Sequence, residues 1–277
     1  MSSKFTIHIV VDNEPGPGLA AEHGFSVWIH CKDRVVLFDT GQGEALIPNL
    51  SSLGLDPSEI TDLVLSHGHY DHGGGIARVL KFCPQAVVHL HPGAVVPRYA
   101  LDPGGDCRYI GLPGEARSVL SQLPDNRLDW VTSPISIDGN IQLTGPIPRK
   151  NHFEDPGGPF YSDLRCQTPD IIADDQALWL GTSQGPVVIC GCAHAGVINT
   201  LDYVREISGT SKIRAVLGGF HLKGASEERI DYTIRGLEKA APEIIMPCHC
   251  TGKKAVKAMK SQVPGLKRCF SGQVLHL

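Results

Sequence analysis

Long apolar runs are missing from this sequence of 277 residues. No stretch approaches the ~20 consecutive apolar residues of a membrane-spanning helix. The start of the chain, Met1 to Phe5, lacks the apolar core of a signal peptide. We therefore expect a cytoplasmic protein that has no membrane partner.

An excess of positive charge is also missing. The formal net charge is −4, which argues against a broad basic surface for nucleic acid. No linker separates the two halves of the chain, roughly 1–140 and 141–277, so we expect one domain over residues 1–277. The sequence leaves the oligomeric state open.

Paired C-x-x-C motifs, which are typical of zinc ribbons, do not occur among the nine cysteines. The chain has two C-x-C pairs instead, Cys190/Cys192 and Cys248/Cys250. The odd number and scattered positions of the cysteines predict reduced thiols and no disulfide framework.

What the chain does have is a dense cluster of metal-binding residue types from Ser66 to Gly75. His67 and His69 follow an apolar run and are two residues apart, so an extended backbone points both to the same side, where they suit one cation. Asp71 and His72 follow where the chain can curl, and they could serve a second cation. The sequence therefore predicts metal binding at the end of a strand.

Apolar strands in the second half also end in histidines. Cys192 and His194 follow the run 186–190, His221 follows 213–217, and His249 follows 243–246. Such strand ends are where α/β folds place ligands. Asp39, at the end of the run 34–38, is expected to hold one of the imidazoles by its far nitrogen.

Helical patterns separate these strands and predict an α/β layer structure. Helices are expected at 43–53, 75–82, 197–207 and 252–262, with a further helix that begins after an N-cap at Ser226. Glycine and proline break the pattern from Pro92 to Leu128, and the segment from Thr144 to Pro169 is also irregular. We expect these two stretches to form a wall or lid over the metal site.

Charged residues of the second irregular stretch offer two interpretations. Arg149, Lys150 or Arg165 would receive an anionic substrate group, or they belong to a solvated loop. His23, in the glycine-rich loop near the start, is a further candidate for substrate contact.

His67-x-His69-x-Asp71-His72 after a short apolar strand resembles the signature of the metallo-β-lactamase superfamily. The segments around Asp39, Cys192, His221 and His249 narrow the resemblance to a subgroup that includes archaeal dihydropterin–ribofuranosylaminobenzene phosphate synthases and related metal-dependent hydrolases. The resemblance implies a four-layer αββα sandwich.

The resemblance also implies a ligand set. In the superfamily the residues that match His67 and His69 hold one metal with a further histidine, those that match Asp71 and His72 hold the other with a last histidine, and an acid bridges the two. This chain departs from the pattern because no bridging Asp is evident where it has Gly191-Cys192. His194 or the Cys192 thiolate could fill that gap. His221 and His249 compete for the last position, unless His249 is a buried and inert residue.

Zn²⁺, with Fe²⁺ or Mn²⁺ as alternatives, suits imidazoles and a carboxylate, and either one or two ions would bind. The leading hypothesis is a hydrolase acting through a metal-activated water on a small phosphorylated or ester-like molecule, with Asp71 as the catalytic residue. The resemblance adds a dihydropterin-methyl transferase that releases diphosphate. A non-catalytic, metal-dependent ligand-binding protein is the third alternative.

Overall fold

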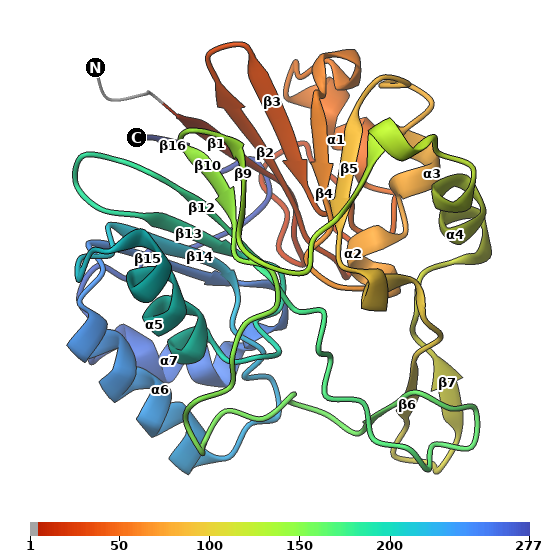
Figure 1. Cartoon of the computed structure of the whole chain (residues 1–277). Coiled ribbons are helices and arrows are strands. Elements are labelled where there is room, and N and C mark those ends of the chain that lie inside the picture. Colours follow the sequence, from red (N-terminus) through yellow and green to blue (C-terminus); the bar gives the residue numbers. More distant parts are fainter. Residues whose placement is uncertain (1–4) are drawn as a thin grey trace.

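The computed structural model describes residues 5–277 and contains two large β-sheets that face each other (Figure 1). The strands of the first sheet, in spatial order, are β16 (Val274–His276), β1 (Thr6–Val11), β2 (Ser26–Cys31), β3 (Arg34–Phe38), β4 (Asp62–Val64), β5 (Val87–Leu90) and β8 (Leu128–Trp130). Those of the second are β15 (Ile244–Cys248), β14 (Ala215–Gly219), β13 (Val187–Cys190), β12 (Ala177–Leu180), β10 (Ile141–Leu143) and β9 (Ile135–Asp138).

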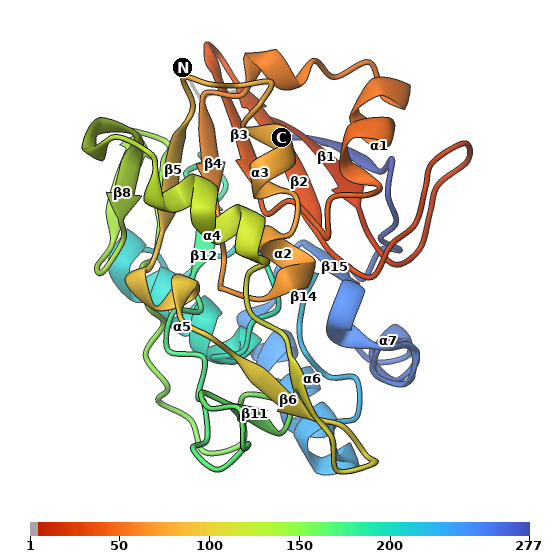
Figure 2. The same cartoon turned by 90° about the vertical axis from the view of Figure 1, so that its right-hand side faces the viewer.

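Helices cover the outer face of each sheet (Figures 1 and 2). The first sheet carries α1 (Leu46–Ser52), α3 (Ile76–Val79) and α4 (Gly114–Ser121), and the second carries α5 (Val197–Ser208), α6 (Glu227–Ala240) and α7 (Lys253–Lys260). A single turn, α2 (Tyr70–Gly73), lies in residues 66–75, the segment predicted to bind metal, which we call the metal loop. The expected four-layer αββα sandwich of the metallo-β-lactamase type is confirmed.

Apolar side chains fill the space between the sheets. Ile7 and Phe38 of the first sheet belong to the same buried cluster as Ile189 and Leu217 of the second. Strands β2 and β13 are buried along nearly their whole length, because one face meets the other sheet and the opposite face meets helices. This explains why β13 is a continuous apolar run, and why β2 is apolar except for Ser26 at its start and the exposed His30.

The start of α6 follows the predicted capping signal. Ser226 caps α6, where its hydroxyl accepts a hydrogen bond from the backbone N–H of Arg229 at 3.1 Å. Glu227 and Glu228 occupy the first turn of α6, where carboxylates stabilise the positive end of the helix dipole.

Two sets of parallel strands decide where the functional residues meet. Strands β3, β4 and β5 run parallel in the first sheet, and β13, β14 and β15 run parallel in the second. Parallel strands deliver their carboxyl ends to the same edge of a sheet. The two edges lie next to each other and form one rim of the sandwich.

The prediction that 92–128 contains no regular element was wrong. This stretch includes β6 (Tyr99–Leu101), β7 (Cys107–Tyr109) and α4, and β11 (Phe160–Tyr161) adds a third strand to β6 and β7. Glycine and proline in this stretch form turns between short elements. For example, Gly105 lies in the hairpin turn between β6 and β7, where its N–H donates to the Asp102 carbonyl at 2.8 Å. We call β6, β7, β11 and their connecting turns (residues 99–109 and 160–169) the arm; it projects from the sandwich on the side of the rim (Figure 1).

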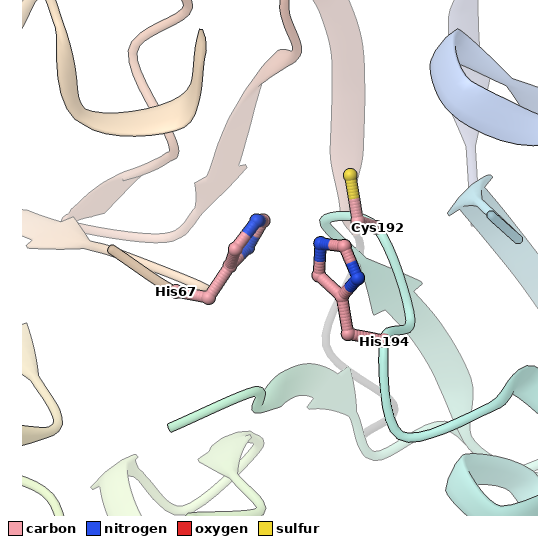
Figure 3. Close-up of side chains that lie close together, drawn as sticks. All are labelled: His67, Cys192 and His194. Carbon is pink, nitrogen blue, oxygen red and sulfur yellow. The ribbon is translucent and has the colours of Figure 1, made fainter. Parts of the chain in front are cut away.

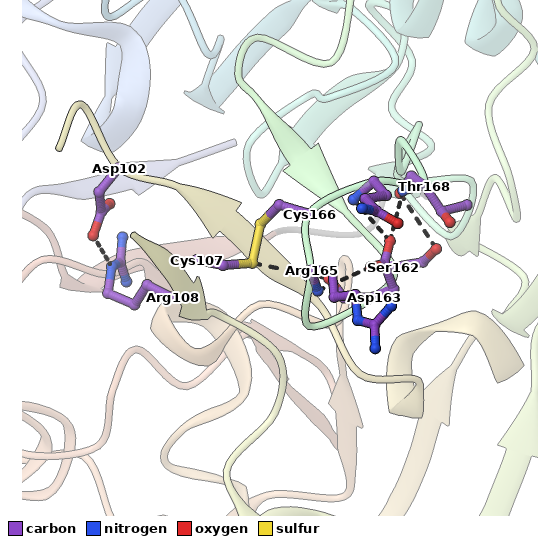
Figure 4. The surroundings of a disulfide bond; sticks show 9 residues. Asp102, Cys107, Arg108, Ser162, Asp163, Arg165, Cys166 and Thr168 are labelled. Carbon is purple, nitrogen blue, oxygen red and sulfur yellow. Dashed lines mark hydrogen bonds and ion pairs between the residues drawn. A yellow bond between two sulfur atoms is a disulfide. The ribbon is translucent and has the colours of Figure 1, made fainter. Parts of the chain in front are cut away.

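The arm also contradicts the expectation that every cysteine is a reduced thiol. A disulfide joins Cys107 in β7 to Cys166, 59 residues later (Figure 4). The Asp163 carboxylate shapes the loop around Cys166 by accepting bonds from three backbone N–H groups. An odd cysteine count does not exclude one pair, and the pairing depends on how the arm folds. The other seven cysteines of residues 5–277 are buried thiols.

Within residues 5–277, no helix has the length and apolar character needed to cross a membrane.

Candidate metal centre

The loop after β4 places two imidazoles side by side, with their ring planes nearly perpendicular. His67 is fully buried and His69 is 5% exposed, and His67 Nε2 lies 2.9 Å from His69 Nδ1. Gly68 between them is required by space, because a Cβ there would lie 2.0 Å from the carbonyl oxygen of Ala94. The turn α2 then carries Asp71 and His72 to the same side.

The second sheet supplies the facing residues. His194 follows β13, and its ring centroid lies 4.7 Å from that of His67 and 4.9 Å from that of His69. Figure 3 shows His67 on one side and Cys192 with His194 on the other, all directed into the space between them. His194 Nδ1 donates to the carbonyl of Pro156 at 2.7 Å, whereas the buried Nε2 has no hydrogen-bond partner in the described chain.

A second group lies beside the first. His72 Nε2 is 3.2 Å from His249 Nε2 and 3.1 Å from Cys192 Sγ. Asp71 Oδ2 is 3.4 Å from His249 Nε2 and 3.8 Å from His72 Nε2. Cys192 Sγ is therefore within reach of both groups, since it also lies with His67 and His194 within 4.8 Å.

The far nitrogens of these rings are held by hydrogen bonds. His72 Nδ1 donates to Asp39 Oδ2 at 2.7 Å, as the sequence predicted for Asp39. His249 Nδ1 donates to Asn13 Oδ1 at 3.0 Å. His67 Nδ1 lies 2.9 Å from Ser66 Oγ, which itself donates to Asp39 Oδ2. Such outer contacts favour the tautomer in which the ring nitrogen that faces the site carries a free lone pair.

The two groups of possible ligands differ in the charge of their histidines. Burial lowers the pKa of His67, His69 and His194 well below the usual range, so all three are neutral. Burial opposes the charged form of His72 as well, but the carboxylates of Asp39 and Asp71 outweigh it and raise the pKa of His72 to about 9. The second group therefore has a negative field that favours a cation at its centre.

The carboxylate of Asp71 is held in its charged form. Burial would raise the pKa of Asp71, yet His72 and His249 keep it well below its usual range. Burial raises the pKa of the Cys192 thiol well above its usual value, so that sulfur becomes a thiolate only where a cation stabilises it.

Backbone strain gathers at the same rim. Asp39, Ala193, His221 and His249 all have φ between 44° and 59°, a region that side chains with a Cβ rarely adopt. Each of them directly follows a strand or lies within three residues of its end. Conformations that cost on the order of 1–3 kcal/mol persist where the surroundings demand them, commonly at functional sites.

The remaining predicted residues lie at the mouth of this site. The His221 ring centroid is 4.2 Å from that of His194, and His221 forms a further possible ligand group with Cys192 and Cys250. His23 is half-exposed, with Nε2 3.3 Å from Asp71 Oδ2.

A cavity of about 170 Å³ opens onto these groups. Its walls include His69, Asp71 and His249 from the rim, together with Ala100, Arg108, Ile110 and Phe160 from the arm and the segment next to it. The expectation that the two irregular stretches form a wall over the site is therefore confirmed by their position.

The expected anion-binding role of Arg149 and Lys150 has no support in the structure. The Arg149 guanidinium donates to the carbonyl oxygens of His194 and Ile171, and Lys150 pairs on the surface with Glu206 at 2.6 Å. Neither residue lines the cavity, and neither does Arg165. Spacing along the chain could not reveal that Arg149 supports the His194 turn.

Sequence reasoning missed several residues that hold the metal loop. Asp174 Oδ2 accepts from Gly68 N at 2.8 Å, and Arg98 binds Asp174 and Asp170 from the other side. Arg98 and Asp174 are 76 residues apart, and no local pattern marks the pair. Asn13 could have been singled out, because Asp12-Asn13 follows a strand directly.

Known proteins resemble this chain in sequence and in structure. The family model described as the metallo-β-lactamase superfamily matches residues 20–161. An uncharacterised protein of Methanocaldococcus jannaschii is 34% identical over 256 residues, which cover 90% of this chain and 92% of the relative. The 7,8-dihydropterin-6-methyl-4-(β-D-ribofuranosyl)-aminobenzene-5′-phosphate synthase of the same organism is 28% identical over 269 residues, with coverage of 92% and 90%. A solved metal-dependent hydrolase of the β-lactamase superfamily has a TM-score of 0.81 and 30% identity over 99% of both chains.

Proposed function

Because the chain belongs to the metallo-β-lactamase superfamily, we propose that it is a metal-dependent hydrolase that holds two divalent ions at the rim and acts on a small molecule. The observation that carries this proposal is the close approach of ring nitrogens that face each other across the site. His72 Nε2 and His249 Nε2 are 3.2 Å apart although both rings use their Nδ1 protons elsewhere. Two such nitrogens repel each other unless a cation or a proton lies between them.

Each of the two groups of side chains would hold one ion. His67 through Nε2, His69 through Nδ1 and His194 through Nε2 would hold one ion. Asp71, His72 and His249 would hold the other, and Cys192 Sγ faces both groups at the place where the superfamily pattern has an acid. The mixed imidazole, carboxylate and thiolate donors favour zinc, with iron(II) and manganese(II) as alternatives.

The ions would lower the pKa of water and neutralise negative charge on the substrate. Asp71 is charged and buried at the cavity wall, so its carboxylate is placed to hold an ion and to accept a hydrogen bond from the activated water. His23 contacts the same Oδ2 atom from the solvent side and orients it. His221 borders the cavity beside His194 and can hold a proton for the leaving group, while the arm excludes bulk water from one side.

Metal content tests this proposal most directly. Protein purified without added metal should contain up to two equivalents of a divalent ion, and the double variant His67→Ala/His69→Ala should lose the ion of the first group. The matched control is His30→Ala/His276→Ala, which removes two exposed imidazoles from strands β2 and β16 and should keep the wild-type content.

Turnover is then measured on a panel of phosphate esters, carboxylic esters and lactones with wild-type protein and both double variants. Hydrolysis that depends on His67 and His69 supports the proposal. Wild-type metal content in His67→Ala/His69→Ala would refute the ligand set. Bound metal without turnover of any member of the panel would refute the hydrolase activity.

A second candidate is group transfer, because the 28% identical archaeal relative is named as the synthase of a phosphorylated dihydropterin compound. The observation that favours it is Cys192 in place of the acid that is usual between the ions. Diphosphate release from a mixture of two substrates, without consumption of water, would distinguish transfer from hydrolysis.

A further inference from the structure

Outside the metal centre, positive charge is concentrated in a cavity of about 740 Å³ next to α7. Six cationic side chains line it, whereas Asp12 and Glu14 are its two acidic residues. The cations are Lys223, Lys253, Lys257, Lys260, Lys267 and Arg268. We call this cavity the basic groove. It contrasts with the formal net charge of −4 of the whole chain.

Most of these cations have no internal partner. Among residues 5–277, no carboxylate lies within 4.0 Å of the ammonium groups of Lys223, Lys257, Lys260 or Lys267. Lys253 pairs with Glu14 at 3.3 Å, and the Asp12 carboxylate is committed to the backbone N–H groups of Glu14 and His249. Like charges gathered without counter-charges raise the free energy of the empty groove, and an anionic ligand would lower it.

Three of the lysines of α7 lie on one side of the helix. Lys253, Lys257 and Lys260 are separated by four and three residues, so they share one face of the helix. Val256 lies on the same side and supplies apolar lining. Lys254 faces away and pairs with Glu227 of α6 at 3.1 Å. On its basic face α7 therefore carries two lysines without a carboxylate partner, Lys257 and Lys260, and on its other side a paired lysine, Lys254, that serves as a control. The place of α7 beside the ends of β14 and β15 can be followed in Figure 2.

The basic groove continues from the metal cavity, because Lys223 and His249 line both. His249 Nε2 faces the metal groups, while its backbone N–H is held by Asp12 on the side of the groove. A molecule whose reacting group sits beside His249 would pass Lys223 before it reaches α7. The two volumes, about 170 and about 740 Å³, suit a small reacting group and a larger charged end.

We propose that the basic groove binds the phosphate-bearing end of a small-molecule substrate whose reacting bond lies at the metal centre. This inference rests on the proposed function, which it extends by naming the chemistry that selects the substrate. Lysine ammonium groups bind phosphate as point charges. The groove is confined to one helix and four short segments in an acidic protein, which fits a small phosphorylated molecule and not a nucleic acid.

Inorganic diphosphate is the probe, titrated by calorimetry into metal-loaded protein at fixed free metal concentration. Lys257→Glu/Lys260→Glu should weaken diphosphate binding by about tenfold for each reversed lysine. Each reversal changes the charge of the side chain by two units, ~6 Å from a phosphate group of the probe at physiological salt. Lys254→Glu, the same change on the other face of α7, should alter binding by less than about twofold. Both lysines of the double variant are exposed, and thermal melting verifies that the variants fold.

Diphosphate can also bind metal ions directly, so the titration is repeated with His67→Ala/His69→Ala. Binding that survives loss of the first ion and fails in Lys257→Glu/Lys260→Glu supports the groove. Binding that is unchanged in Lys257→Glu/Lys260→Glu, or no binding to wild-type protein, overturns it. The hydrolase proposal is judged separately by metal content and turnover, so either proposal can fail while the other stands.

Discussion

The Asp39 carboxylate organises both halves of the metal loop, which makes Asp39→Asn an informative perturbation. Asp39 Oδ1 accepts from Ser66 N at 2.7 Å, and Oδ2 accepts from both Ser66 Oγ and His72 Nδ1 at 2.7 Å. All three partners donate. An asparagine keeps the shape but turns one acceptor into a donor, so either orientation of its amide sets a donor against a donor.

The magnitude follows from these contacts. One buried donor left without an acceptor costs about 1–3 kcal/mol of folding free energy. Loss of the partner that orients a ligating imidazole typically weakens metal binding 10–100-fold, or about 1.4–2.7 kcal/mol. The larger effect should fall on the ion held by His72, since His67 keeps its contact with Ser66.

Competition with a chelator of known affinity measures each ion separately. Asp129→Asn is the matched control, because Asp129 Oδ2 accepts from His89 Nδ1 at 3.0 Å in the same kind of carboxylate–imidazole pair away from the rim. Equal metal affinity of Asp39→Asn and wild-type protein would show that Asp39 does not orient a ligand.

Three further outcomes are expected. Asp71→Ala should retain one equivalent of metal and lose most activity; full activity would remove Asp71 from the mechanism. Gly191→Ala should weaken metal binding, because its Cβ would lie 2.1 Å from Ser66 Oγ, whereas Gly139→Ala, which meets nothing within 4 Å, should not. Burial raises the pKa of Asp175 from 3.8 to about 7. The unfolded chain therefore loses this proton at a lower pH than the folded chain, and the free energy of unfolding falls as the pH rises from about 4 to about 7. Urea unfolding at pH 5 and pH 8 covers about two pK units of that change, so Asp175→Asn should remove about 2.6 kcal/mol of the loss; an unchanged pH dependence would contradict the shift.

Local sequence patterns were sufficient for the strands that carry the site. Apolar runs that end in a histidine mark β13, β14 and β15, and their common direction brings His194, His221 and His249 to one rim. The contact of Asp39 with the far nitrogen of His72 was also predictable, because an acid at a strand end near a histidine cluster has few other partners.

The arm could not be predicted in the same way. Its strands are two or three residues long, too short for a period-two pattern, and β11 joins β6 across about 60 residues of chain. The disulfide and the contact between Arg149 and the His194 carbonyl depend on that long-range arrangement. The basic face of α7 was visible in the sequence, but its position beside His249 was not, because it requires the packing of α7 against the rim.

The strained turns explain why the histidines can converge at all. A strand that continued straight past its end would carry its side chains away from the opposite sheet. The left-handed conformations of Ala193, His221 and His249 turn the chain back at that point and direct the imidazoles into the gap between the sheets. Each turn costs free energy that the apolar layers below must offset, whereas the rings themselves are too polar to provide it when buried. A bound cation would supply the missing stabilisation at the rim itself, so the metal would belong to the folding of this edge as well as to its chemistry.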